Sequence, residues 1–166
     1  MNVNAAIDAD PRAALIDGLK NTRAGMLGIE GSGQHFQPMT HYADWDLNCI
    51  WFMTSKDTDL VRALTPGARA QFIIMDEKNG FDASLAGRLT EDLDRAKLDE
   101  YWSSVAAAWF HGGKSDPLLT MLRLDLVDAA LWGYDDGKLK FGFEILKSNI
   151  DEDKTPNIGT HRVITF

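Results

Sequence analysis

Residues 34–60 read QHFQPMTHYADWDLNCIWFMTSKDTDL, and this stretch predicts two β-strands joined by a tight turn. His35, Gln37 and Met39 alternate with Phe36, Pro38 and Thr40, which is the two-residue period of a strand. Asp44–Asp46 supplies turn residues, and the apolar run Leu47–Met53 is the second strand. A pair of short strands around a polar turn indicates a protein that is rich in β-structure.

The second strand ends in the polar residues Thr54–Thr58, and a short helix is predicted after them over Asp59–Leu64. Hydroxyls and the Lys56 ammonium beside unpaired helix N–H groups would suit an anion. The alternative is that Thr58 caps the helix and that Lys56 is solvated. The local pattern favours the cap.

Length and composition indicate one soluble globular domain over residues 1–166, with a core at about 10–146 and a C-terminal extension at 147–166. Hydrophobic residues make up 45% and charged residues 25% of the chain, which is typical of that class. No stretch approaches the length of about 20 apolar residues that a membrane span needs. The acidic N-terminus is unlike a signal peptide, so a cytoplasmic location is expected.

Charge and metal-ligand spacing exclude several kinds of partner. A net charge of −8 argues against nucleic acid, which binds clustered Lys and Arg. The four histidines lack the spacing of metal ligands, so no metal site is expected. The single cysteine, Cys49, lies in an apolar run and is predicted to be buried. Neither a phosphate-binding loop nor a dinucleotide fingerprint is present.

The rest of the chain continues the pattern of short strands with a few helices. Helices are predicted over Pro11–Lys20, with Asp10 as cap, and from Thr90 to about Ser104. The alternative for the second helix is that it continues over Ala106–Phe110 until Gly112-Gly113 stops it. The further predicted strands are Ala24–Glu30, Arg69–Met75, Phe81–Thr90, Leu118–Val127, Ala129–Tyr134, Lys138–Leu146 and Arg162–Phe166. The fold class is therefore mainly β, a closed or partly closed antiparallel β-barrel with helices.

In its order of motifs, the chain resembles the general stress protein branch of the pyridoxamine 5'-phosphate oxidase-like, FMN-binding split-barrel superfamily. The matching segments are QPMT at 37–40, WFMTSKDT at 51–58, Gly87-Arg88, Trp102, WFHGG at 109–113, Asp116-Pro117, LRL at 122–124 and Trp132. The resemblance covers roughly Pro11 to Trp132. It implies a six-stranded antiparallel split barrel, a homodimer, and FMN in a groove where two subunits meet.

The resemblance also implies which residues bind the cofactor. Gln37, Pro38, Met39 and Thr40 would run along the flavin ring and the ribityl chain. Met53, Thr54, Ser55 and Lys56 would face the ribityl and phosphate groups, and Thr58 would donate to the phosphate. Trp109 and Trp132 would form an aromatic wall. A flavin needs such a flat apolar slot together with hydrogen-bond donors.

Two positions depart from the pattern of that family. The family carries Arg where this chain has Gln37 and Lys where it has Leu60, and Asp59 adds an anion beside the expected phosphate. Charge-assisted hydrogen bonds are roughly twice as strong as neutral ones, so these changes weaken phosphate binding and admit riboflavin as the ligand. The substrate pattern of pyridoxamine phosphate oxidases is absent, so that activity is not expected.

Three hypotheses about function follow. The first is an FMN-dependent oxidoreductase of the general stress protein type that acts on an unidentified small acceptor. No residue stands out as its catalytic acid or base. The second is a non-catalytic flavin-binding dimer that serves as a carrier or sensor. The third is a family member that has lost the cofactor.

Overall fold

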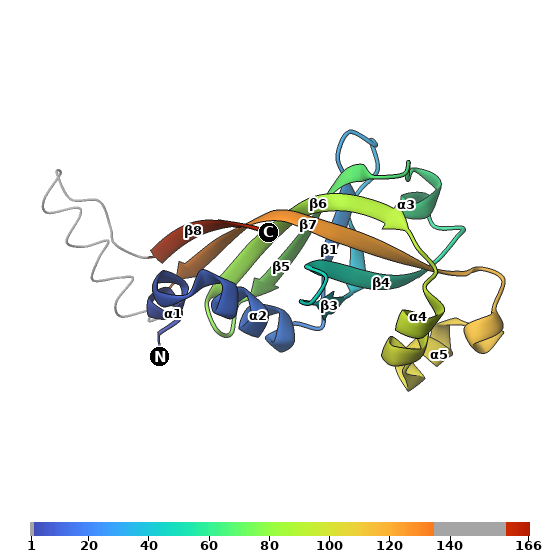
Figure 1. Cartoon of the computed structure of the whole chain (residues 1–166), viewed down its shortest axis with the longest axis horizontal. Helices are drawn as coiled ribbons and strands as arrows, with labels where there is room; N and C mark the ends of the chain where they lie inside the picture. Colours follow the sequence, from blue (N-terminus) through green and yellow to red (C-terminus); the bar gives the residue numbers. More distant parts are fainter. Residues whose placement is uncertain (1, 135–158) are drawn as a thin grey trace, which may run out of the picture. The chain divides into compact units, whose positions relative to one another are not determined.

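The computed structural model describes residues 2–134 and 159–166, which form a mainly β fold with short helices (Figure 1). This confirms the predicted fold class. The strands are β1 (Ala24–Ile29), β2 (Gln37–Thr40), β3 (Tyr42–Asp44), β4 (Cys49–Ser55), β5 (Ala68–Asp76), β6 (Phe81–Glu91), β7 (Leu119–Tyr134) and β8 (Gly159–Thr165). The helices are α1 (Val3–Ala9), α2 (Pro11–Asn21), α3 (Asp59–Arg62), α4 (Arg95–Tyr101), α5 (Ser104–Trp109) and the 3-10 turn η1 (Gly113–Ser115).

The strands form one sheet in the order β2-β1-β5-β6-β7-β4-β3, and β8 pairs with β7. The pairs β1–β2, β1–β5, β3–β4 and β4–β7 are antiparallel. The sheet in the described residues has eight strands, whereas the resemblance implied six. The number is larger because the chain between Gln37 and Asp44 divides into two short strands and because the C-terminal segment adds β8.

Chain connectivity requires this sheet to curl. β2 and β3 stand at opposite ends of the strand order, yet only His41 separates them in the sequence. Consecutive Cα atoms are about 3.8 Å apart, so Thr40 and Tyr42 lie within about 8 Å of each other. β2 also contacts β4. The two ends of the sheet therefore meet at this single residue.

The predicted helix from Thr90 to Ser104 is wrong at both ends. Thr90 and Glu91 belong to β6, and the Asp92 N–H donates to the Met121 carbonyl at 2.9 Å, which extends the strand pairing. The helix begins only after Asp94, whose carboxylate accepts from the Lys97 N–H at 2.9 Å. A second helix, α5, then follows the extended link of Trp102 and Ser103.

Two further differences between prediction and structure concern the strand β7 and the N-terminal helix α1. The segments predicted as separate strands on either side of Asp128 form the single strand β7, because its backbone keeps partners there: the Leu126 N–H donates to Asn48 O, and Val127 O accepts from the Phe166 N–H. The helix α1, capped by Asn2, was not predicted. The predicted strand Lys138–Leu146 and residues 147–158 lie outside the described part of the chain.

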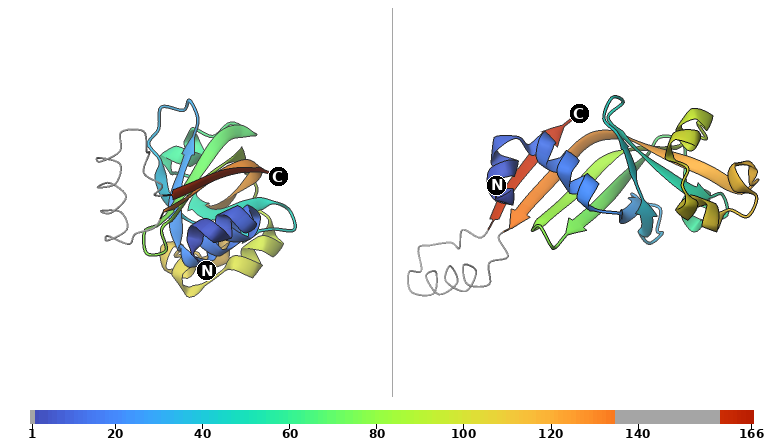
Figure 2. Two further views of the ribbon diagram at one scale, coloured as in Figure 1. Left: turned by 90° about the vertical axis from the view of Figure 1, so that its left-hand side faces the viewer. Right: turned by 90° about the horizontal axis from the view of Figure 1, so that it is seen from below.

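The described residues divide into two compact units, and β5, β6 and β7 contribute to both. The first unit contains α1, α2 and β8, and both helices lie against that strand (Figure 2). Asp8 of α1 pairs with Arg162 of β8 at 2.6 Å. The second unit comprises Arg23–Ile73, Leu85–Asp128 and Phe166, and it holds the candidate site. The single-domain assignment stays a prediction.

Candidate functional site

A pocket of about 370 Å³ lies within the second unit. Its volume is in the range of small-molecule sites, which is about 300–1,000 Å³. Strands β2 and β4 line one side of it, and α5 lines the other. The lining residues are Gln37, Pro38, Met39, Thr40, Met53, Thr54, Ser55, Thr58, Val105, Ala106, Trp109 and Phe110. We call the eight residues from Gln37 to Thr58 the strand wall and the last four the helix wall.

The strand wall is fixed by close packing of the sheet. Met39 and Thr54 are each only 7% exposed, and Met39 pairs with Gly25 of β1. A Cβ atom on Gly25 would lie 2.4 Å from the carbonyl oxygen of Ile73 and 2.6 Å from the ring of Phe72. Glycine at this position therefore lets β1 approach β5 closely and holds β2 at the edge of the pocket.

The helix wall has much less support of its own. Ser103 caps α5 by accepting from the Ala106 N–H at 3.3 Å, and Ala106 is the buried residue of this six-residue helix. Phe110, which follows it, belongs to the same apolar cluster as Trp51. The side chain of Trp109 is 79% exposed, although it lines the pocket. A large exposed aromatic side chain at a pocket is a surface available to a planar ligand.

The pocket lining is mainly apolar and carries no charged side chain. None of its twelve lining residues is an Asp, Glu, His, Cys, Tyr, Lys or Arg. Its side-chain donors and acceptors are one amide, four hydroxyls and one indole N–H, from Gln37, Thr40, Thr54, Ser55, Thr58 and Trp109. Such a lining can position a ligand by neutral hydrogen bonds and apolar contact, and it offers no side chain that would exchange a proton near neutral pH.

At the polar end of the strand wall, the predicted cap is confirmed. The Thr58 hydroxyl accepts from the Val61 N–H at 3.3 Å and donates to the Ser55 carbonyl at 3.0 Å. The N–H of Thr58 also points to that carbonyl, at 3.2 Å. The donors of Thr58 are therefore engaged within the chain, and a ligand phosphate would have to compete with Ser55 for them.

Nine of the eleven cofactor-binding residues predicted from the sequence line this pocket, and Lys56 and Trp132 do not. Lys56 is exposed, and its N–H donates to the Leu118 carbonyl at 2.8 Å. Trp132 stacks on His161 with a centroid distance of 5.1 Å. Three lining residues were missed, namely Val105, Ala106 and Phe110. The sequence pattern predicted one helix that Ala106–Phe110 would continue, so α5 was not recognised as a separate helix; the cap residue Ser103 was the available signal.

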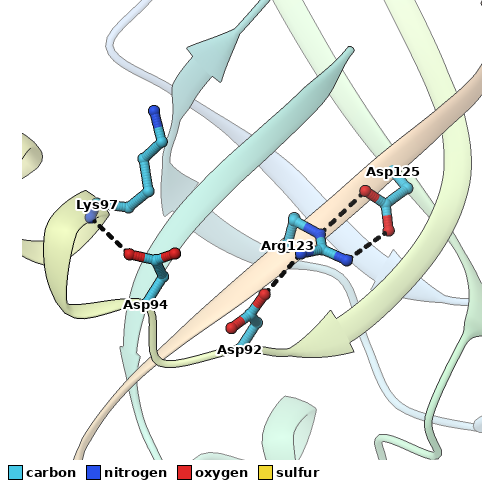
Figure 3. A network of polar contacts seen from close by, with 5 residues as sticks. All are labelled: Asp92, Asp94, Lys97, Arg123 and Asp125. Atoms are coloured by element: carbon cyan, nitrogen blue, oxygen red, sulfur yellow. Dashed lines mark hydrogen bonds and ion pairs between the residues drawn. The ribbon is translucent and has the colours of Figure 1, made fainter. Parts of the chain in front are cut away.

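Charged residues gather on β7 and beside α4. Arg123 donates to Asp92 at 2.6 Å and to Asp125 at 3.0 Å, and its guanidinium lies 5.7 Å from the centroid of the Trp51 ring (Figure 3). Burial raises the pKa of the Cys49 thiol to about 11, so this cysteine stays protonated and unreactive at neutral pH.

Among residues 2–134 and 159–166, no group of His, Cys, Asp and Glu could hold a metal ion.

The sequence of this chain matches the family model described as pyridoxamine 5'-phosphate oxidase like over residues 10–157. The chain therefore belongs to that family. Among curated protein sequences, none matches it. No helix in the described residues is long and apolar enough to cross a membrane.

Three solved structures are similar in both sequence and fold. A candidate general stress protein 26 from Jannaschia sp. CCS1 is 38% identical, with 95% of this chain and 99% of that chain covered and a TM-score of 0.75. A candidate general stress family protein from Xanthomonas campestris pv. campestris is 37% identical (78% and 90% covered, TM-score 0.70). The general stress FMN/FAD binding protein from Xanthomonas citri is 39% identical (72% and 86% covered, TM-score 0.66).

Proposed function

We propose that the pocket between the strand wall and the helix wall binds a flavin, with FMN as the first candidate and riboflavin as the second. The observation that carries the proposal is that nine residues, chosen from the sequence as flavin contacts, line one pocket of suitable volume. The Xanthomonas citri relative is named as an FMN/FAD binding protein, which supports the same ligand class.

The lining fits two of the three parts of FMN. Met39, Met53 and Trp109 offer apolar and aromatic surface for the ring system. The hydroxyls of Thr54 and Ser55 suit the ribityl chain. The lining contains no cation for the phosphate. Lys56, which is exposed and follows the lining residue Ser55, is the cation that we propose for the phosphate. When bound, the flavin would supply the redox chemistry, and the chain would supply binding, orientation and exclusion of water.

On this basis we propose a flavin-dependent oxidoreductase that acts on an unidentified small acceptor. The second candidate is a non-catalytic carrier or sensor of flavin, and a specific observation favours it: the pocket lining holds no side chain that would act as an acid or base. Turnover with a reduced nicotinamide and an electron acceptor separates the two. Steady-state oxidation of the nicotinamide by flavin-loaded protein supports the enzyme, and binding without turnover supports the carrier.

The test of the binding site is a flavin titration of the purified protein by fluorescence quenching, with FMN and riboflavin in parallel. We expect both to bind, and we expect Lys56→Ala to weaken FMN much more than riboflavin, because only FMN carries the phosphate. Lys78→Ala, which changes an exposed lysine of the other unit, is the control. Equal losses for both ligands would contradict the assignment of Lys56 to the phosphate. Protein that binds neither flavin would contradict the proposed function.

We further propose that the protein is a homodimer with the ligand groove at the subunit interface. The exposed apolar residues of the helix wall support this, since Val105 is 52% and Trp109 is 79% exposed in the single chain. Sedimentation equilibrium at micromolar concentration would give twice the mass of 18.5 kDa. A monomer that still binds flavin would show that one chain completes the site.

A further inference from the structure

The contacts of β3 reach the helices that carry one wall of the pocket. Asp44, the last residue of β3, is 8% exposed, and its carboxylate lies 2.7 Å from the ammonium of Lys97 in α4. The same ammonium lies 3.0 Å from Glu100, so Lys97 bridges a buried and an exposed carboxylate. The Lys97 bond lowers the pKa of Asp44, which keeps the carboxylate ionised where it is buried.

Tyr42, two residues earlier in β3, makes two more contacts in the same direction. Its ring stacks on that of Tyr101, the last residue of α4, with centroids 4.9 Å apart and planes inclined by 16°. The Ser103 side chain also acts on the Tyr42 hydroxyl: burial raises the pKa of Tyr42, and the interaction with Ser103 lowers it. Ser103 is the cap of α5, so this contact lies at the junction between the two helices.

The helix α5 depends on such outside support. It contains no charged residue, and Ala106 is the residue it buries. Phe110 follows it in the apolar cluster, and beyond Phe110 the chain is tied by the Gly112 N–H, which donates to Asp116 at 3.1 Å. Its N-terminal end is joined to α4 by Trp102 and Ser103 alone. The position of α4 is therefore passed on to α5 over a link of two residues.

We propose that β3 is the element that positions α5, and that it thereby sets the width of the pocket; the effect on ligand affinity rests on the proposed flavin site. One segment, Gln37–Asp44, then has two tasks. Its first half, β2, lines the pocket as part of the strand wall, and its second half, β3, holds the helices of the opposite wall. His41 is the single residue between the two halves. Asp44, Lys97 and Tyr42 are positioning residues, since none of them lines the pocket.

Charged and titratable side chains of α4, β4 and β7 surround the ion pair between Asp44 and Lys97. Asp44 and Lys97 interact with one another and with Glu100 and Tyr101 of α4. Cys49 in β4 lies in the field of Asp44, Asp125, Arg123 and Lys97. The alternative to the proposal is that the apolar cluster around Trp51 and Leu98 alone holds α4 and α5, and that the polar contacts of β3 add nothing.

The test compares Lys97→Met and Tyr42→Phe with the wild-type protein in two measurements. The first is amide hydrogen exchange without ligand, followed at Ala106 and Ala107, whose N–H groups bond to Ser103. We expect exchange in α5 to rise about tenfold in Lys97→Met, while exchange in β1 stays unchanged. Lys97→Arg keeps the charge and should restore slow exchange. Unchanged exchange in α5, or an equal rise in both regions, would overturn the proposal.

The second measurement is flavin affinity under conditions where each variant is fully folded. We expect the dissociation constant to rise about tenfold in Lys97→Met and about threefold in Tyr42→Phe, with rescue by Lys97→Arg. The control is Arg69→Met, which removes an ion pair with Glu30 of the same unit at 3.0 Å and should leave affinity unchanged. The proposal would be overturned if the dissociation constants of all these variants simply followed their free energies of unfolding, whether or not the changed residue contacts α4. If wild-type protein binds no flavin, the proposed function fails, and the exchange measurement still decides the role of β3.

Discussion

The two walls of the pocket are built in opposite ways. The strand wall is part of a paired sheet, and its inner residues Met39 and Thr54 are almost fully buried. The helix wall consists of the six-residue helix α5, which has one buried residue, and of Phe110 after it; its Trp109 is largely exposed. A sheet resists local change because each strand is bonded to its neighbours, whereas a short helix with few buried contacts opens at low free energy. Changes in the strand wall should therefore affect stability, and changes in the helix wall should affect binding.

The largest effect is expected from Gly25→Ala, which disturbs the support of the strand wall. The added Cβ would meet the Ile73 carbonyl and the Phe72 ring at 2.4–2.6 Å, and a backbone carbonyl cannot rotate away as a side chain can. We expect a loss of about 2–3 kcal/mol in the free energy of unfolding, measured by urea denaturation. Ala24→Ser, at the exposed neighbouring position, is the control. An unchanged midpoint of urea denaturation would mean that the strand wall tolerates the added Cβ atom and is no more rigid than the helix wall.

A smaller effect, on binding alone, is expected from Trp109→Ala in the helix wall. Loss of an aromatic stacking surface should raise the flavin dissociation constant about tenfold, or about 1.4 kcal/mol. The free energy of unfolding should change by less than about 0.5 kcal/mol, because the side chain is exposed. Trp132→Ala is the informative partner variant. An equal loss of affinity there would place Trp132 in the site through a second copy of the chain.

The smallest expected effect is a pH-dependent change in the free energy of unfolding. The folded-state pKa of Asp44 lies below its ordinary value of 3.8, chiefly because of the bond from Lys97. The ionised Asp44 carboxylate therefore contributes fully to stability at a pH above its ordinary pKa of 3.8. This contribution is lost as the pH falls through the lower pKa of the folded state. We expect Asp44→Asn to be less stable than wild type by about 1 kcal/mol at neutral pH, with the difference vanishing in acid. A difference that persists below the folded-state pKa would contradict the ion pair as its cause.

Sequence patterns predicted the strand wall well, because it rests on local signals. Alternation around Met39, the apolar run before Thr54 and the capping hydroxyl of Thr58 all lie within one short stretch. The helix wall was predicted only in part. Trp109 was included and a helix was expected to continue over Ala106–Phe110, but the break at Trp102 and Ser103 that begins a separate helix was missed. Directly before that break, Tyr101 stacks on Tyr42, about 60 residues away in the sequence, and such a contact leaves no local pattern.

The continuity of β7 and the strand-like pairing of Asp92 after β6 were missed for a similar reason. Polar residues such as Asp92 and Asp128 look like turn or helix signals when they are considered alone. In the structure, the Asp92 N–H is bonded to Met121, and its carboxylate pairs with Arg123. Pairing partners supplied by the fold override the local preference of a polar residue in a strand.

The meeting of the two sheet ends at His41 also bears on aggregation. An edge strand carries unpaired backbone groups that can recruit another chain, and long, flat edges are the most hazardous. Here the edge strands β2 and β3 have four and three residues, and Pro38 removes one donor from β2. Because β2 and β3 are held together by one residue, neither offers a long open edge to a neighbour. The connection at His41 thus also limits strand addition at these two edges of the sheet.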